Sequence, residues 1–309
     1  SALVWGIGSE FLFRNGWSLG LDYQLSRVSA SESSFALRAK VTKELGAKGL
    51  PKLLQDVDFD LNDENDIQVD TGYTWDDNIT RGRVAGDILV DNLYTLNVSK
   101  TVLVELGGNS RLLLTAAAGG ERFQNFNGLS KFTLTGEAAY QYRRTADFDA
   151  ATWGAFAKLT GEEFQSELRD GYRYSLGVSV LQPLTDRITL SGALSVNGRR
   201  ARSEVFRTMD SSARFNVDYA LGRGATLYFG GEYRKGDIVS TGLASLENSS
   251  IAKMLVADDA FDVGRFTSYR LDATTWLTTI GYNIGLGARD SIDLSWRRVQ
   301  STPSLRPGW

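Results

Sequence analysis

Apolar and polar residues alternate with a period of two along most of the chain. In the stretch GWSLGLDYQLSRV, apolar residues occupy every second place from Trp17 to Leu25, with small or polar residues between them. Successive side chains of a β-strand point to opposite faces, so this spacing predicts a strand with one apolar and one polar face. Such a strand fits a soluble sandwich and also an outer-membrane barrel, whose apolar face looks into lipid.

The same alternation predicts strands along the rest of the chain. They are expected within 3–13, 16–28, 67–75 and 94–105, and at 111–123, 131–143, 151–161, 172–182, 187–198, 212–221, 225–235, 267–284 and 291–300. Each is about ten residues long, as a tilted strand needs to cross a bilayer, whereas strands of soluble proteins average about five or six. The pattern predicts an all-β fold, a transmembrane antiparallel up-and-down β-barrel with about fourteen strands visible.

The connections and the aromatic residues favour the same interpretation. Short turns near 107–110, 185–186, 222–224 and 285–290 alternate with longer connections at 76–92, 124–130, 199–210 and 236–265, an asymmetry typical of outer-membrane barrels. With the short turns in the periplasm, two aromatic girdles are expected. The inner one comprises Phe13, Trp17, Tyr140, Tyr142 and Tyr282, and the outer one Trp75, Tyr172, Tyr174, Tyr233, Tyr269 and Trp296.

The directions of the strands put both ends of this sequence on the long-loop side. Barrels of this kind begin and end in the periplasm, so we expect at least one further strand at each end and a parent barrel of sixteen strands. The tail STPSLRPGW contains two prolines and is typical of a loop. The sequence has no run of about twenty apolar residues that would predict a membrane-spanning helix, and it does not open with a signal peptide.

Taken together, these features resemble the Gram-negative bacterial outer-membrane β-barrel proteins, along most of the chain and as a pattern rather than a motif. Within it, GYTWDDNITR (Gly72 to Arg81) resembles a stretch of the β-barrel porins associated with exopolysaccharide operons. The Trp-Asp here departs from that stretch. The resemblance implies a channel in the bacterial outer membrane and, by analogy only, a polysaccharide role.

The segment 29–66 fits two structures within the single barrel domain expected for 1–309. Residues 34–46 alternate as a strand does, but they are also rich in helix formers, with Leu37, Val41 and Leu45 on one helical face. A strand would make 46–66 a long periplasmic linker. A helix would make 30–52 an excursion into a loop or the lumen, followed by a short strand near 57–61.

Composition excludes several classes of chemistry. The 309 residues include no Cys and no His, so there is no thiolate metal site, no His-ligated zinc centre and no Ser-His-Asp relay. With 34 basic and 37 acidic residues, the net charge of -3 argues against a nucleic-acid partner. We expect no catalytic site, no cofactor and no bound metal. Asp58, Asp60, Asn62, Glu64 and Asp66 resemble a calcium loop in spacing, but Asp63 replaces its turn glycine and Val69 its closing glutamate.

The polar faces of the strands carry charges of both signs. The alternation predicts that these side chains line a pore: Asp70, Glu105, Glu137, Arg143, Lys158, Arg173, Arg214, Asp218, Glu232, Arg234, Arg270, Asp272, Asp293 and Arg297. This lining predicts a hydrated channel with little net ion preference; an interior closed by salt bridges is the alternative.

Two long loops could carry further contacts. Arg199, Arg200, Arg202 and Arg207 form a basic cluster that suits the phosphates of lipopolysaccharide or an anionic glycan, or is simply a solvated loop. The run SIAKMLV (250–256) is apolar and needs burial in a pore constriction, against a partner, or on the barrel rim.

The sequence therefore predicts a non-enzymatic outer-membrane channel, either a passive porin-like pore or an export pore for a glycan. The alternative is a non-conducting scaffold that anchors or encloses a partner protein. The expected surroundings are outer-membrane lipid and lipopolysaccharide.

Overall fold

The computed structural model describes residues 2–13, 17–27, 33–45, 67–80, 85–222, 224–244, 246–261, 265–286 and 290–304. Their fifteen strands are β1 (Ala2–Leu12), β2 (Trp17–Arg27), β3 (Ser33–Leu45), β4 (Ile67–Asp76), β5 (Asp91–Gly107), β6 (Ser110–Phe123), β7 (Lys131–Arg143), β8 (Thr152–Phe164), β9 (Gly171–Pro183), β10 (Ile188–Ala201), β11 (Thr208–Gly222), β12 (Ala225–Leu243), β13 (Met254–Ala257), β14 (Phe266–Gly285) and β15 (Asp290–Pro303).

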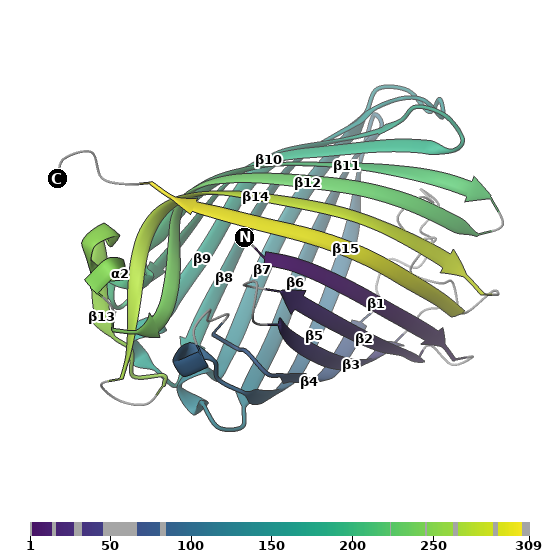
Figure 1. Cartoon of the computed structure of the whole chain (residues 1–309). Coiled ribbons are helices and arrows are strands. Elements are labelled where there is room, and N and C mark those ends of the chain that lie inside the picture. Colours follow the sequence, from purple (N-terminus) through teal and green to yellow (C-terminus); the bar gives the residue numbers. More distant parts are fainter. Residues whose placement is uncertain are drawn as a thin grey trace.

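Fourteen of these strands form one closed antiparallel barrel (Figure 1). Neighbours in sequence are neighbours in the sheet, β12 pairs with β14, and β1 pairs with β15 to close the ring. The short strand β13 pairs only with β14 among the described residues. The predicted all-β up-and-down barrel is confirmed, with fourteen strands in the ring. The expected sixteen-stranded parent concerns residues beyond this chain and stays a prediction.

The ambiguous segment contains a strand. β3 pairs with β2 on one side and β4 on the other, so two backbone ladders outweigh the helix-forming residues of its sequence. Leu37 is exposed on the outer face, while Arg38 and Thr42 lie on the inner face. The expectations for 46–66, including the short strand near 57–61 and the calcium-like spacing, lie outside the described residues.

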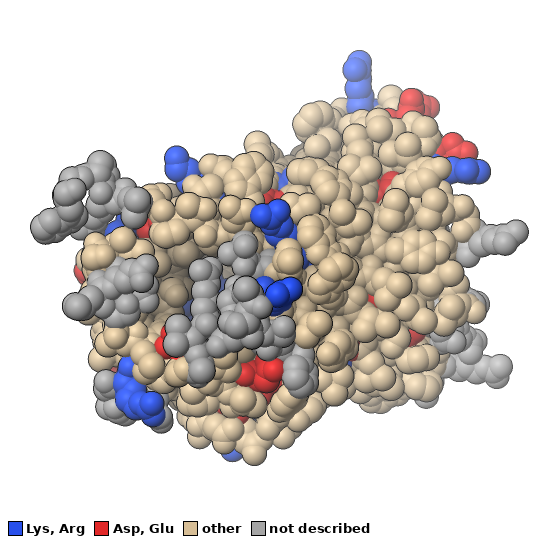
Figure 2. Space-filling model, viewed as in Figure 1, with Lys and Arg blue, Asp and Glu red and all other residues tan. Residues whose placement is uncertain are grey.

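The outer face of the barrel is apolar. Alternate side chains such as Leu134, Leu176 and Leu194 are more than half exposed there, and Figure 2 shows uncharged side chains over most of the wall on one side. A soluble sandwich would bury these rows of apolar side chains between two sheets. In this protein the rows lie on the outside of a single closed sheet. An uncovered apolar wall of this extent requires lipid around it.

The side chains expected in the aromatic girdles differ in exposure, and the girdles stay a prediction. Phe13, Trp17, Tyr140 and Tyr142 are exposed near the short-turn end. Tyr269, expected in the outer girdle, is instead buried in β14.

The two ends of the barrel differ. The turns β5–β6, β9–β10 and β11–β12 are short, and the first uses positive φ angles at Gly107, Gly108 and Asn109. The opposite end carries the short helices η1 (Ala85–Asp87), η2 (Asn127–Leu129), η3 (Glu167–Arg169), η4 (Glu204–Phe206) and α2 (Leu246–Ile251), together with β13. No helix in the described part of the chain is both long and apolar enough to cross a membrane.

Candidate functional site

The inner wall of the barrel carries most of the predicted pore-lining residues. Strand alternation places the following side chains on the face opposite the exposed apolar rows: Asp70, Glu105, Glu137, Arg143, Lys158, Arg173, Arg214, Asp218, Glu232, Arg234, Asp293 and Arg297. Side chains on this face that are not charged are mostly small or polar. Hydroxyl pairs join neighbouring strands across it, such as Thr101 with Thr115 (2.9 Å) and Ser195 with Ser212 (2.8 Å). The lining is hydrophilic.

Arg270 and Asp272 depart from this pattern. They share a strand face with Trp276, which is exposed on the outside, and they lie where β14 continues beyond its pairing with β15. Arg270 Nη1 donates to the carbonyl oxygens of Glu204 (2.9 Å) and Arg207 (2.7 Å) in the β10–β11 loop. Both residues therefore belong to the loop end of the barrel and not to the lumen wall, because β14 leaves the wall before it reaches them.

Charges on the inner wall are paired between strands. Lys40 Nζ lies 3.0 Å from Asp70, Lys158 Nζ lies 3.3 Å from Glu137, and Arg214 Nε lies 3.6 Å from Glu232. Nearer the long-loop end, Glu162 is 2.9 Å from Arg173 and 3.2 Å from Arg199. Four of these pairs join adjacent strands along the wall, and the pair of Glu162 with Arg199 reaches from β8 across β9 to β10.

The predicted basic cluster does not assemble at one place. Arg199 faces the lumen beside Glu162, whereas Arg200 is exposed on the opposite face of the same strand. Arg202 pairs with Glu167, and Arg207 donates from Nε to the carbonyl oxygen of Ala201 (2.8 Å). The cluster is divided because two of its members lie on a strand, where neighbouring residues point apart.

The hairpin β12–β14 crosses the long-loop mouth of the barrel. In the ring, six strands (β6 to β11) separate this hairpin from the hairpin β4–β5 on one side, and four (β15, β1, β2 and β3) on the other. The two hairpins therefore start from nearly opposite sides. Even so, the backbone N–H of Leu243 donates to Asp87 Oδ1 of the β4–β5 loop at 2.7 Å. This contact requires the hairpin to bend over the opening, as Figure 1 shows.

We call the described residues of the five loops 77–90, 124–130, 165–170, 202–207 and 244–265 the cap. A small apolar cluster joins it to the ends of β12 and β14: Ala260, Phe261 and Phe266 are buried and pack against Ile79, Leu89, Phe126, Leu129 and Leu243. The approach is close, because a Cβ placed on Gly128 would lie 2.9 Å from the Cβ of Ala260. Two separate loops and the β12–β14 hairpin thus share one packed interior.

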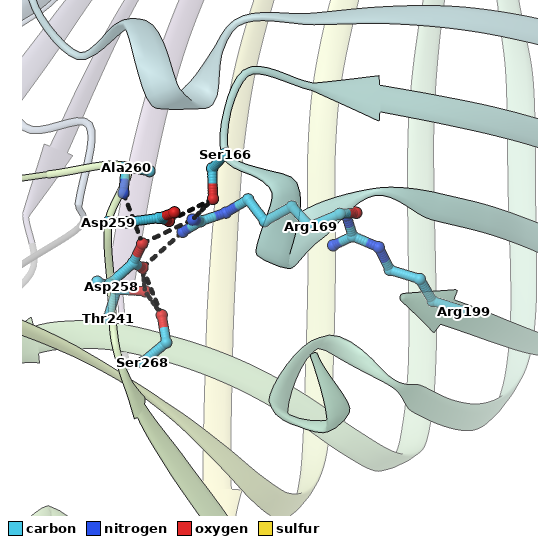
Figure 3. A network of polar contacts seen from close by, with 8 residues as sticks. All are labelled: Ser166, Arg169, Arg199, Thr241, Asp258, Asp259, Ala260 and Ser268. Carbon is cyan, nitrogen blue, oxygen red and sulfur yellow. Dashed lines mark hydrogen bonds and ion pairs between the residues drawn. The ribbon is translucent and has the colours of Figure 1, made fainter. Parts of the chain in front are cut away.

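A buried ion pair within the cap joins the β8–β9 loop to the β12–β14 hairpin (Figure 3). Arg169 Nη1 and Nη2 each donate to one carboxylate oxygen of Asp258 at 2.6 Å, and both side chains are buried. Asp258 also accepts from Ser268 Oγ (2.6 Å) and from the backbone N–H of Ala260 (3.1 Å). The Arg169 guanidinium lies 4.4 Å from the ring centroid of Phe206. Pairing in a fork with full hydrogen bonding is the geometry in which buried charges are tolerated.

The ion pair also sets the protonation of Asp258. Burial raises the pKa of its carboxyl, but the hydrogen bonds and charge of Arg169, with the hydrogen bonds from Ser268 and Ala260, outweigh burial and hold the pKa below its ordinary value. Asp258 is therefore ionised in the cap at neutral pH.

Two expectations about this loop change. The apolar run 250–256 does not supply the buried interior, since Leu255 and Met254 are exposed; Phe261 and Phe266 supply it instead. Strand alternation carries no information about Arg169 or Asp258, because neither residue lies in a strand. The available signal was two phenylalanines, Phe261 and Phe266, close in sequence to the carboxylate of Asp258, which needs a partner if it is buried.

Among the described residues, no group of three or more His, Cys, Asp or Glu side chains could hold a metal ion. The polar contacts at the long-loop mouth join the β12–β14 hairpin to the neighbouring loops, as in the pair of Arg169 with Asp258 and the hydrogen bond from Leu243 to Asp87. These contacts can hold the hairpin in position over the hydrophilic lumen.

No protein-family model and no curated protein matches the chain. Among solved structures, it is similar to CdiB from Escherichia coli, with 12% identity, a TM-score of 0.43, and 97% of this chain and 63% of CdiB covered. It is also similar to the outer-membrane expressed OmpT of Vibrio cholerae, with 9% identity, a TM-score of 0.38 and 97% of each chain covered. A third is the toluene transporter TodX of Pseudomonas putida, with 8% identity, a TM-score of 0.35, and 97% and 89% covered.

This chain spans 63% of the length of CdiB from Escherichia coli. The closed sheet, the strand length and the apolar outer wall themselves define the class of protein, which is a bacterial outer-membrane β-barrel.

Proposed function

We propose that the chain is a non-enzymatic outer-membrane channel for hydrophilic solutes, and that the β12–β14 hairpin controls access through its long-loop mouth. The observation that carries the proposal is the combination of a hydrophilic inner wall with a hairpin that crosses one opening. Small inner side chains leave room for water in a barrel of this size. Permeation follows the lumen, and the cap sets its narrowest approach.

A glycan as the permeant, whether imported or exported, rests on the resemblance of residues 72–81 alone. It remains a prediction within this proposal. Cross-strand Ser, Thr and Asn side chains on the inner wall would suit hydroxyl-rich solutes by exchanging hydrogen bonds with them.

A scaffold role is the second candidate, and one observation favours it. β13 pairs on one edge only within the described residues, and Leu255 on this strand is exposed. An uncovered strand edge with an exposed apolar side chain can accept a partner strand. In this second function the cap binds a protein at the mouth and the barrel anchors it.

Planar-bilayer conductance separates the two functions. The unmodified chain and a variant with 246–261 replaced by a short Gly-Ser link are compared, and their heat-modifiable migration on gels confirms that both barrels are folded. The channel proposal expects a larger or longer-lived current from the variant. If both folded proteins never conduct, the channel proposal fails and the scaffold role gains support.

A further inference from the structure

Acidic and basic side chains on the lumen wall differ in exposure. The Arg214 side chain is 64% exposed and its partner Glu232 14%; Arg173 is 54% exposed and Glu162 2%; Lys40 is 50% exposed and Asp70 15%. The same order holds for Arg234 with Asp210, Arg38 with Asp22, and Lys158 with Glu137. Among the ion pairs of the described inner wall, only Lys131 with Glu121 reverses it.

This difference has a physical cause. Lys and Arg have long flexible stems that carry the charge away from the backbone, whereas Asp and Glu keep theirs near the wall. The wall also holds the carboxylates in place: Asp70 accepts from Thr42 Oγ1 (2.6 Å) and Gln68 Nε2 (2.9 Å), and Asp210 accepts from Asn197 Nδ2 (2.9 Å). The acids are recessed and hydrogen-bonded, and the bases extend into the lumen.

A solute in the lumen interacts most strongly with the charges that it can approach. Coulomb energy falls with distance, and at physiological ionic strength the screening length is about 8 Å, so nearby exposed groups dominate. The net charge of the whole chain, -3, does not report this surface. Glu105 is the exposed carboxylate of the predicted lining and lies next to the short β5–β6 turn, away from the exposed bases of the other strands.

We infer that the accessible lumen surface is cationic and that the channel selects anionic solutes, those that carry carboxylate, phosphate or sulfate groups. Arg173, Arg214 and Arg234, with Lys40 and Lys158, form the selecting surface. Guanidinium groups suit such ligands because they donate in a planar fork. The inference rests on the proposed channel function and replaces the expectation of little ion preference.

Reversal potentials in a potassium chloride gradient test the inference directly. The unmodified protein and the Asp258→Asn variant, whose cap is loosened, are both measured. The salt concentrations are about 0.1 M on one side and about 0.03 M on the other, where screening lengths of at least about 10 Å preserve selectivity. We expect a chloride-to-potassium permeability ratio above one. Arg173→Gln with Arg214→Gln lowers this ratio by roughly twofold, because two of the five named cations are removed.

Two matched substitutions act as controls. Arg200→Gln removes one charge from the outer face of β10 and leaves the ratio unchanged. Glu232→Gln removes the recessed partner of Arg214 and raises the ratio by less than Arg214→Gln alone lowers it.

Three results would overturn the inference. A conducting channel with a ratio of one or less contradicts it and leaves the channel function intact. Equal and opposite effects of Arg214→Gln and Glu232→Gln show that the two partners are equally accessible. The absence of any current, including from the Asp258→Asn protein, contradicts the channel function and this inference with it.

Discussion

Removing Asp258 is expected to release the hairpin from the mouth of the barrel. Asp258→Ala leaves the Arg169 guanidinium buried without its carboxylate, between Phe206 and Phe261. Breaking a buried ion pair by deleting one partner costs about 3–5 kcal/mol. Since about 1.4 kcal/mol corresponds to a factor of ten, the ratio of open to closed cap should rise about 100-fold to 4000-fold.

Single-channel recording in planar bilayers measures this ratio as the open probability. Asp259→Ala is the matched control: the neighbouring carboxylate is exposed and accepts one hydrogen bond, from Ser166 Oγ, so its loss costs about 1 kcal/mol. Arg169→Leu with Asp258→Leu removes both charges and should perturb the cap less than either single change. The reasoning is refuted if folded Asp258→Ala protein has the open probability of the unmodified chain.

Two further predictions concern the cap. Gly128→Val places side-chain atoms against Ala260 and should weaken the closed cap by about 1–3 kcal/mol, which is measured as more frequent opening. Gly136→Val is the control, because a Cβ at this position on the outer wall meets nothing within 4 Å and should not change the opening frequency. Equal effects of the two substitutions would contradict the packing described. The pKa of Asp258 is lowered in the folded cap, so its contribution to stability is complete above the unfolded value of about 3.9 and is lost as pH falls through the lower folded value. The open probability should therefore stay constant from pH 7 to about pH 4 and rise below about pH 4. In the Asp258→Asn protein this acid-dependent rise should be absent. If the rise persists in the Asp258→Asn protein, another group titrates in this transition.

Strand alternation predicted the barrel because each strand obeys a local rule. The period of two distinguishes the outer and inner faces of β10. The strand predicted at 187–198 overlaps the observed Ile188–Ala201, beginning one residue earlier and ending three residues earlier. The prediction stops early for β12, at 235 against the observed Leu243. Beyond Gly236, whose φ is +143°, the hairpin leaves the wall, and its side chains meet the other loops instead of lipid and lumen.

The cap could not be predicted in this way. Arg169 and Asp258 are 89 residues apart, and the apolar cluster combines residues from separate loops that have no shared period. Their meeting depends on the closure of the ring, which brings the β4–β5 and β12–β14 hairpins to opposite sides of one mouth. The exposure of Arg214 relative to Glu232 also follows from reach and hydrogen bonding on the wall, which residue type alone does not specify.

The most direct test of the central claim is cysteine labelling along β10, because the chain has no native cysteine. Leu194→Cys, Ser195→Cys, Val196→Cys and Asn197→Cys proteins in membranes are treated with a membrane-dissolved or a water-soluble maleimide. The barrel described here predicts alternation: positions 194 and 196 react from the lipid, and 195 and 197 react from water. Uniform labelling of all four positions by the water-soluble reagent, in folded protein, would contradict it.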